Sequence, residues 1–266
     1  MKKRNKKLFV GGVIGFLLSL IVCVMVPFNR KDAVVNVSID DVEYSFKNLY
    51  ENPEYTSVFQ QPFFAYLRDC HLKYNCTFTL YVYANMGGQS DKFKKEFEKN
   101  SDWLRFGFHA IRPKFNKQET ADYAKFITAF LRVDSVLTYS VGETTKASTL
   151  RLHYYYATPS EVEFLRKHGI KRLLTSDDER VSYSLPSKLN DKVIKANSIA
   201  YAGMNFRRTN LRMERMNFLP VDLRMTPNDT IVFFTHESQL QSKRGKLRFS
   251  YCLWFFNKQN CKFKFI

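Results

Sequence analysis

The chain has 266 residues, of which 45% are hydrophobic and 16% are aromatic. This is enough apolar material for a folded core, so the composition excludes an intrinsically disordered protein and fits one ordinary domain with a small appendage. The 42 Lys and Arg residues exceed the 25 Asp and Glu residues, and the formal net charge of +17 predicts an anionic partner: phospholipid headgroups, an acidic polysaccharide or nucleic acid.

The N-terminus carries a membrane-targeting pattern. Residues 1–7 form a basic tail, and residues 8–28 contain no charged side chain. A helix of that length, at about 1.5 Å per residue, crosses the hydrocarbon core of a bilayer. A cleaved signal peptide is the alternative, but no A-x-A-like site occurs near the end of the run, so we expect an uncleaved signal anchor. The positive-inside rule then predicts a single-pass protein of the cell membrane with residues 29–266 extracytoplasmic and with no nucleic-acid partner.

Four cysteines follow this run, in two pairs that are close in sequence: Cys70 with Cys76, and Cys252 with Cys261. Outside the cytoplasm each pair could form a disulfide, and free buried thiols are the alternative. The sequence leaves both open. No C-x-x-C pair occurs, so a cysteine zinc site is not predicted.

Strands and helices alternate in the first half of the remaining chain. The β-branched run at 34–38 predicts a buried strand, and Pro62 is placed to begin a helix. A strand at 77–84, a short helix at 90–99 and a strand at 103–108 follow. This order is typical of a parallel sheet.

The alternation continues towards the C-terminus. Apolar residues at helical spacing predict a helix from Tyr123 to Leu131, and residues 137–141 and 150–156 are predicted as the fourth and fifth strands. Thr158, Pro159 and Glu161 form a capping box that begins a helix ending near Gly169. Further strands are expected at 170–174 and 231–235, while residues 187–229 show no clear pattern. We therefore predict one α/β domain, residues 29–266, with a barrel-like arrangement.

Polar side chains lie at the predicted strand ends: Asp40 and Asp41 after the first, His109 after the third, His153 within the fifth, and His236 with Glu237 after the last. The carboxyl ends of parallel strands meet at one edge, so we expect these groups to lie together. Each histidine alone is explained as a hydrogen-bonded core residue, and the acid pair alone as the cap of a turn. The occurrence of all these polar residues at strand ends favours a functional site.

One aspartate and two histidines suit a borderline divalent metal that keeps an open position for water. Adjacent residues of a strand point to opposite faces, so Asp40 and Asp41 can have different roles.

Four segments resemble the motifs of the polysaccharide deacetylases of the NodB-homology family. SIDD (38–41) is similar to the first motif, in which the first Asp is the catalytic base and the second binds the metal. FGFHA (106–110) is similar to the second motif, which supplies a metal-binding histidine, and RLHY (151–154) aligns with the R-x-P-Y third motif. FFTHE (233–237) resembles the last motif, whose histidine is the general acid. The resemblance covers about residues 34–240 and implies a distorted (β/α) barrel.

The chain departs from the family pattern at three places. Pro113 stands where the second motif usually has its second histidine, and His153 stands where the third motif has proline. No D-x-x-D-W stretch represents the fourth motif, although Asp177 and Asp178 could lie nearby. We expect His153 to supply the missing ligand.

The resemblance implies the following roles. Asp41, His109 and His153 would hold a divalent metal, expected to be zinc, and Asp40 would be the base, positioned by Arg151. His236 would be the general acid. Weaker candidates for substrate contact are Tyr154, Glu237 and Asp177, where Glu237 could also orient His236.

The function implied by this resemblance is removal of N-acetyl or O-acetyl groups from a cell-envelope or extracellular polysaccharide or oligosaccharide. A basic stretch at 207–215, with Lys243, Arg244 and Lys246, could hold an anionic polymer or lie against the membrane, and a solvated basic face is the alternative. Two other functions remain open: a non-catalytic glycan-binding or polysaccharide-assembly protein on the same scaffold, and a glycoside hydrolase that uses Asp40 and a second acid.

Overall fold

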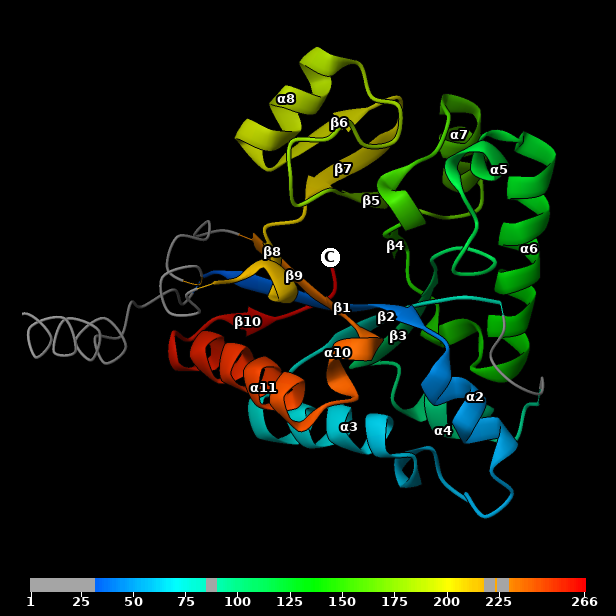
Figure 1. Ribbon diagram of the computed structural model, residues 1–266, viewed down its shortest axis with the longest axis vertical. Coiled ribbons are helices and arrows are strands. Elements are labelled where there is room, and N and C mark those ends of the chain that lie inside the picture. Colours follow the sequence, from blue (N-terminus) through cyan, green and yellow to red (C-terminus); the bar gives the residue numbers. More distant parts are fainter. Residues whose placement is uncertain (1–31, 85–89, 218–222, 224–229) are drawn as a thin grey trace, which may run out of the picture.

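The computed structural model describes residues 32–84, 90–217, 223 and 230–266, and its strands form two sheets (Figure 1). The larger sheet has the order β3-β2-β1-β9-β8, with β10 paired to β1, and the smaller has the order β4-β5-β7-β6. The strands are β1 (Val34–Val42), β2 (Phe78–Val82), β3 (Leu104–Phe108), β4 (Thr149–Leu150), β5 (Arg172–Thr175), β6 (Ser198–Tyr201), β7 (Met204–Arg208), β8 (Leu211–Arg212), β9 (Thr230–His236) and β10 (Lys262–Phe263).

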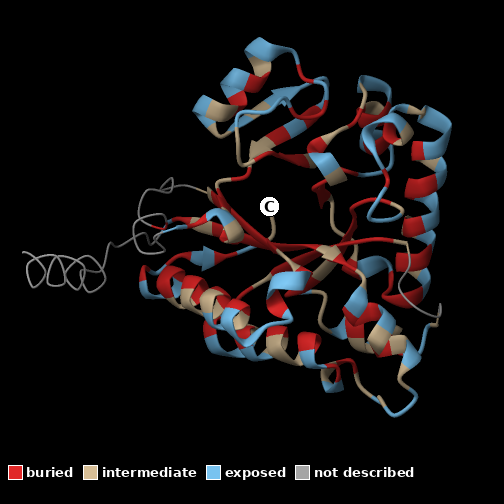
Figure 2. Ribbon diagram, in the orientation of Figure 1, coloured by how far each residue is buried: buried red, intermediate tan, exposed pale blue. Residues whose placement is uncertain are grey.

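Helices cover the outer faces of these strands (Figures 1 and 2). They are α2 (Tyr44–Glu51), α3 (Pro62–Tyr74), α4 (Lys94–Lys99), α5 (Lys117–Ala121), α6 (Tyr123–Ser140), α7 (Pro159–Lys167), α8 (Ser187–Ala196), α10 (Glu237–Leu240) and α11 (Lys243–Lys258). Short 3-10 turns lie at Val58–Gln60, Glu143–Thr145, His153–Tyr155 and Met213–Arg215.

Strand β1 is the centre of the larger sheet. It pairs in parallel with β2 and β9 along its length and with β10 at its start. Val35, Val37 and Ile39 are fully buried, which explains why this run is apolar and rich in β-branched residues. Because β1, β2, β3 and β9 are all parallel, their carboxyl ends lie at one edge.

The two sheets are joined at both sides by backbone hydrogen bonds. The amides of Ala147 and His153 donate to the carbonyls of Phe106 and His109 at 2.8 and 3.0 Å, and the Asn210 amide donates to Val232 at 2.9 Å. Only the β6–β7 hairpin is antiparallel among the described strand pairs. The predicted α/β class with parallel strands is confirmed, and its strands are divided between two sheets.

Helix α7 begins as its sequence predicts. The Thr158 side chain accepts a hydrogen bond from the Glu161 amide, the Glu161 side chain accepts one from the Thr158 amide, and Pro159 occupies the first turn. Helix α3 likewise begins with Pro62, and the Gln61 side chain accepts hydrogen bonds from the first-turn amides of Phe63 and Phe64. These caps satisfy amides that have no partner within the helix.

Two predicted strands are wrong. Residues 137–140 continue α6, because Val133, Val136, Leu137 and Ser140 are buried at helical spacing. Of residues 150–156 only Leu150 belongs to a strand, β4, and His153 begins a 3-10 turn in which Tyr154 and Tyr155 have φ of 58° and 54°. This turn brings His153 back to His109.

The predicted basic tail and signal anchor, residues 1–28, lie outside the described residues. Within the described part of the chain, no helix is both long and apolar enough to cross a bilayer. Cys70, Cys76 and Cys252 are buried free thiols, so neither of the two local disulfides is formed.

Candidate metal centre and active site

Asp41, His109 and His153 bring one oxygen and two nitrogen atoms together at the carboxyl edge of the sheet. One potential ligand atom from each lies within 4.8 Å of the other two. His109 Nε2 lies 3.2 Å from Asp41 Oδ1 and 3.2 Å from His153 Nδ1, and His153 Nδ1 lies 3.8 Å from Asp41 Oδ1. Three residues from distant segments therefore converge on one point.

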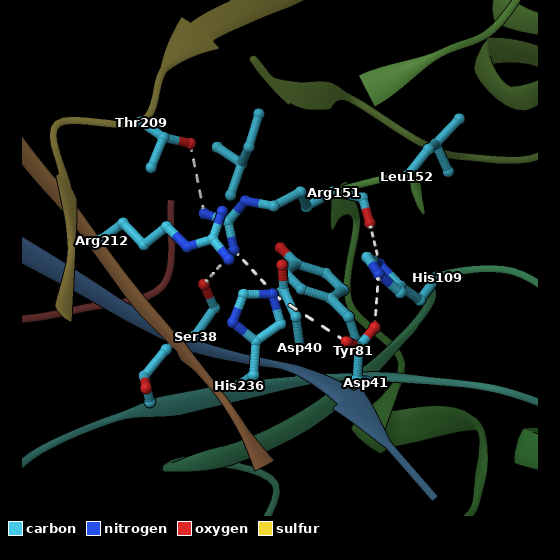
Figure 3. Close-up of polar contacts among 12 residues, drawn as sticks. Ser38, Asp40, Asp41, Tyr81, His109, Arg151, Leu152, Thr209, Arg212 and His236 are labelled. Atoms are coloured by element: carbon cyan, nitrogen blue, oxygen red, sulfur yellow. Dashed lines mark hydrogen bonds and ion pairs between the residues drawn. The ribbon is translucent and has the colours of Figure 1, made fainter. Parts of the chain in front are cut away.

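The backbone of β1 directs the side chains of Asp40 and Asp41 to different partners. The register between β1 and β2 shifts between Ile39 and Val42, and Asp41 has a φ of 59°, in the left-handed region. This irregularity turns Asp41 towards the histidines, while Asp40, in regular register with His236 of β9, points to Arg151 (Figure 3).

The ring of His109 is fixed by a second contact. Its Nδ1 lies 2.6 Å from the carbonyl oxygen of Arg151 and donates a hydrogen bond to it (Figure 3). Nδ1 therefore carries a proton, and Nε2 faces Asp41 and His153. Metal-binding histidines are commonly held in this way.

His153 is held in its neutral form. Burial and the neighbouring His109 lower the pKa of His153 to about 4, against the opposing effects of Asp41 and the Pro113 backbone. Neutral imidazole is the form that binds a metal. Pro113 provides no side-chain ligand, and only its backbone acts on the His153 ring.

Asp41 is kept ionised by its neighbours. Burial works against the charge, but hydrogen bonds from His109 and Tyr83 and the charges of His109 and His236 hold the pKa of Asp41 well below its usual range. Tyr83 donates its hydroxyl to Asp41 Oδ1, and the same hydroxyl lies 3.4 Å from His153 Nδ1.

Asp40 forms a buried ion pair with Arg151. Arg151 Nη1 donates to Asp40 Oδ1 at 2.8 Å and to Ser38 Oγ at 2.7 Å, and both side chains of the ion pair are at most 3% exposed (Figure 3). Burial opposes the charge on Arg151, but the charge of Asp40 outweighs it and raises the pKa of Arg151. The guanidinium also lies 4.1 Å from the ring centre of Phe234, which fixes its plane.

His236 faces the centre from β9, the neighbouring strand. Its Nε2 lies 3.9 Å from Asp41 Oδ2, and its Nδ1 donates to Glu214 Oε1 at 3.0 Å. Burial favours the neutral ring, but the hydrogen bond to Glu214 and the charges of Asp40, Glu214 and Asp41 outweigh it and raise the pKa of His236. Reciprocally, the hydrogen bond and charge of His236 overcome burial and lower the pKa of Glu214 to about 2.

Two residues of this site were not predicted from the sequence. Glu214 is an isolated acid in the basic stretch 207–215, and that isolation is the signal that could have drawn attention to it. Tyr83 follows β2 in a segment rich in aromatic residues, where nothing distinguishes it from the core residue Tyr81.

The three weaker substrate candidates occupy different places. Tyr154 is 43% exposed, and its ring lies 4.1 Å from that of His153, so it borders the site. Asp177 forms an ion pair with Arg215 at 3.0 Å, so Glu214 and not Asp177 is the acid beside His236.

Glu237 does not orient His236. Its carboxylate oxygens accept hydrogen bonds from the amides of Glu43, Tyr44 and Ser45 at 3.1, 3.0 and 2.7 Å. Glu237 therefore caps the start of α2, whose own first residues supply no side-chain cap.

The residues present fit a divalent metal. An ionised carboxylate oxygen and two imidazole nitrogens converge, and a backbone carbonyl orients the ring of His109. Mixed nitrogen and oxygen donors of this kind are typical of zinc and related borderline metals.

Neither a protein-family model nor a curated protein sequence matches the chain. Solved structures do match. A CE4 esterase from Streptococcus mutans is similar with a TM-score of 0.51 and 11% identity, covering 90% of this chain and 88% of that one. The Bc1960 peptidoglycan N-acetylglucosamine deacetylase is similar with a TM-score of 0.50 and 8% identity, covering 88% of this chain and 91% of that one. The resemblance that the sequence motifs predicted is thus confirmed at the level of the fold: the chain has the fold of the CE4 polysaccharide deacetylases, at a very low sequence identity.

Proposed function

We propose that this protein is a divergent, metal-dependent carbohydrate deacetylase with a distorted (β/α) barrel, a hydrolase that removes N-acetyl or O-acetyl groups from a cell-envelope or extracellular polysaccharide. The observation that carries the proposal is the convergence of Asp41, His109 and His153 beside a buried Asp40–Arg151 pair and a His236–Glu214 pair.

Three groups of residues have distinct tasks in acetyl hydrolysis. Asp41, His109 and His153 would hold the metal, and a bound metal would lower the pKa of a water molecule and polarise the acetyl carbonyl. Asp40, held by Arg151, accepts a proton as general base. His236, held by Glu214 and with a raised pKa, donates a proton to the departing amine or alkoxide. The base and the acid come from adjacent strands in matched register.

Burial of Arg151 supports a catalytic role for Asp40. A surface salt bridge would explain an exposed arginine, but Arg151 is 1% exposed, and its contacts to Ser38 and Asp40 are built into the core. Such a network fixes the orientation of the carboxylate.

A non-catalytic glycan-binding or polysaccharide-assembly protein is the second candidate. Pro113 favours it, because the histidine usual at that position in the family motif is absent. His153 offers a nitrogen at the centre in its place, which supports the enzyme as the first candidate.

Acetate release from N-acetylated and O-acetylated oligosaccharides tests the proposal. We expect Asp40→Asn and His236→Asn each to lower kcat by about 10²–10⁴-fold, because each removes a proton-transfer group. Asp69→Asn, which changes an exposed carboxylate of α3, is the matched control and should leave the rate unchanged. Unchanged acetate release in both site variants would refute the assignment. New reducing ends without acetate would indicate the glycoside hydrolase instead.

We further propose that residues 8–28 anchor the protein in the cell membrane, with the domain outside the cytoplasm. The support is the uncharged length of this run and the basic tail that precedes it.

A further inference from the structure

The last two elements of the chain form a basic surface beside the start of β1. Strand β10 pairs with β1, with Val34 opposite Lys262, and the amides of Lys262 and Lys264 donate to the carbonyls of Ala33 and Val35 at 2.8 and 3.0 Å. Lys258, Lys262 and Lys264 are all exposed, and we call these three residues the basic end. The point where the chain enters the domain therefore lies beside the basic end (Figure 1).

The charge here is one-sided. Residues 258–266 contain three Lys residues and no Asp or Glu. Within the described part of the chain, none of the three lysines of the basic end forms an ion pair. Their charges are thus available to an external anion.

The N-terminal sequence indicates that this anion is a membrane headgroup. Only residues 29–31 separate the proposed anchor from Asp32. Even fully extended, this connection reaches about 14 Å, which is comparable with the Debye length of about 8–10 Å in physiological salt. An anchored domain therefore holds this end within electrostatic range of the headgroups.

The candidate active site lies at the other end of β1. Val34 begins the strand beside the basic end, and Asp41 lies seven residues further on, roughly 23 Å away at the usual rise of a strand. An anionic polymer bound at the basic end would be far from Asp40 and His236, so charge complementarity together with the short connection favours the membrane over a polymeric substrate.

We propose that the basic end docks on anionic phospholipid headgroups and holds the candidate active site on the side of the domain that faces away from the bilayer. This inference rests on the proposed anchor and is independent of the deacetylase activity.

Hydrogen–deuterium exchange of the full chain tests the proposal. The chain is placed in nanodiscs of phosphatidylcholine alone, or of phosphatidylcholine with about one third phosphatidylglycerol. We expect slower exchange of residues 258–266 in the anionic nanodiscs, and loss of the difference at about 1 M salt, where the Debye length is about 3 Å.

Two triple variants test whether the lipid-dependent protection comes from the basic end or from the net charge of the chain. Lys258→Glu, Lys262→Glu and Lys264→Glu together should abolish the difference between the two lipids. Lys188→Glu, Lys192→Glu and Lys195→Glu change three exposed lysines of α8 by the same total charge and should leave it unchanged. Circular dichroism confirms that both variants are folded, and Gln in place of Glu serves where they are not.

Different results would contradict different parts of the proposal. Equal exchange in both lipids, or equal loss in both triple variants, would overturn the docking surface. Stronger protection by soluble polyglutamate than by anionic nanodiscs would indicate a polymer-binding surface instead. Release of the chain from membranes by carbonate would overturn the anchor and this orientation, whereas acetate release would still test the deacetylase separately.

Discussion

Tyr83 adds a hydroxyl to the candidate metal centre formed by Asp41, His109 and His153. It donates to the same oxygen of Asp41 that faces His109 and His153. Tyr83→Phe should therefore weaken metal binding by about tenfold, because groups that orient metal ligands typically contribute that much or more. Competition with a chelating dye measures the dissociation constant.

Tyr81→Phe is the control for that variant. Tyr81 is also buried at the end of the same segment, but its hydroxyl donates to the Thr149 carbonyl and touches none of the three ligands. Both variants should lose about 1 kcal/mol of stability, and only Tyr83→Phe should bind metal more weakly. Equal metal affinity in the two variants would remove Tyr83 from the centre.

Glu214 raises the pKa of His236 and hence, in the proposed mechanism, sets the alkaline limit of activity. The pKa of His236 is raised, so the protonated acid form is present at low pH and is lost as the pH rises through that value. Glu214→Gln removes the negative charge, lowers the pKa of His236, and should move the alkaline limb of the rate profile down by about one pH unit.

Glu237→Gln is the control for the pH experiment, because Glu237 adjoins His236 in sequence but its carboxylate binds the α2 amides. Its profile should keep the original alkaline limb. An unshifted limb in Glu214→Gln would show that His236 is not the proton donor.

At the level of residues, the sequence predicted the site residues whose chemistry is unusual for their position. Acids at a strand end and histidines after strands stand out against apolar runs, and the structure brings Asp41, His109 and His153 together. Tyr83 and Glu214 were not predicted, because their roles depend on contacts across 42 and 22 residues of chain.

At the level of elements, Glu237 links the last strand to the first helix. Its carboxylate accepts three amide hydrogen bonds at the start of α2. Glu237→Gln should therefore lower the free energy of unfolding by about 1–2 kcal/mol, the usual effect of losing a helix cap. Urea denaturation measures it.

Glu51→Gln, at the exposed end of the same helix, is the matched variant. Glu51 forms only an exposed ion pair with Lys47 at 4.0 Å and should change stability by less than about 0.5 kcal/mol. If the two variants were equally stable, the cap would not contribute to the fold.

The elements that the sequence predicted well carry local signals. The capping box at Thr158 and the β-branched run at Val34 correctly predicted α7 and β1. The run at 137–141 and the tyrosines at 154–156 were assigned to strands because short apolar and aromatic runs do not distinguish a strand from the end of a helix or a turn. Packing decides these cases, and for His153 it produced the turn that returns to His109.

At the scale of the whole molecule, the alternation of strands and helices correctly predicted an α/β fold with parallel strands. The division into two sheets was not predicted, because it depends on backbone hydrogen bonds between segments such as Phe106 and Ala147 that leave no pattern in the sequence. The parallel arrangement also explains why distant motifs form one site: every contributing strand ends at the same edge.

We propose that His153 completes a metal site in a chain that has Pro113 where the family motif usually has its second histidine. The most direct measurement is the divalent metal content of the full chain after purification and dialysis, with His153→Ala compared with His168→Ala. His168 lies at the end of α7, where its Nδ1 contacts the Phe164 carbonyl at 2.8 Å. We predict one zinc or similar divalent ion per chain in the parent protein and in His168→Ala, and loss of that ion in His153→Ala. A parent chain without a stoichiometric ion, or a His153→Ala variant that retains it, would contradict the account.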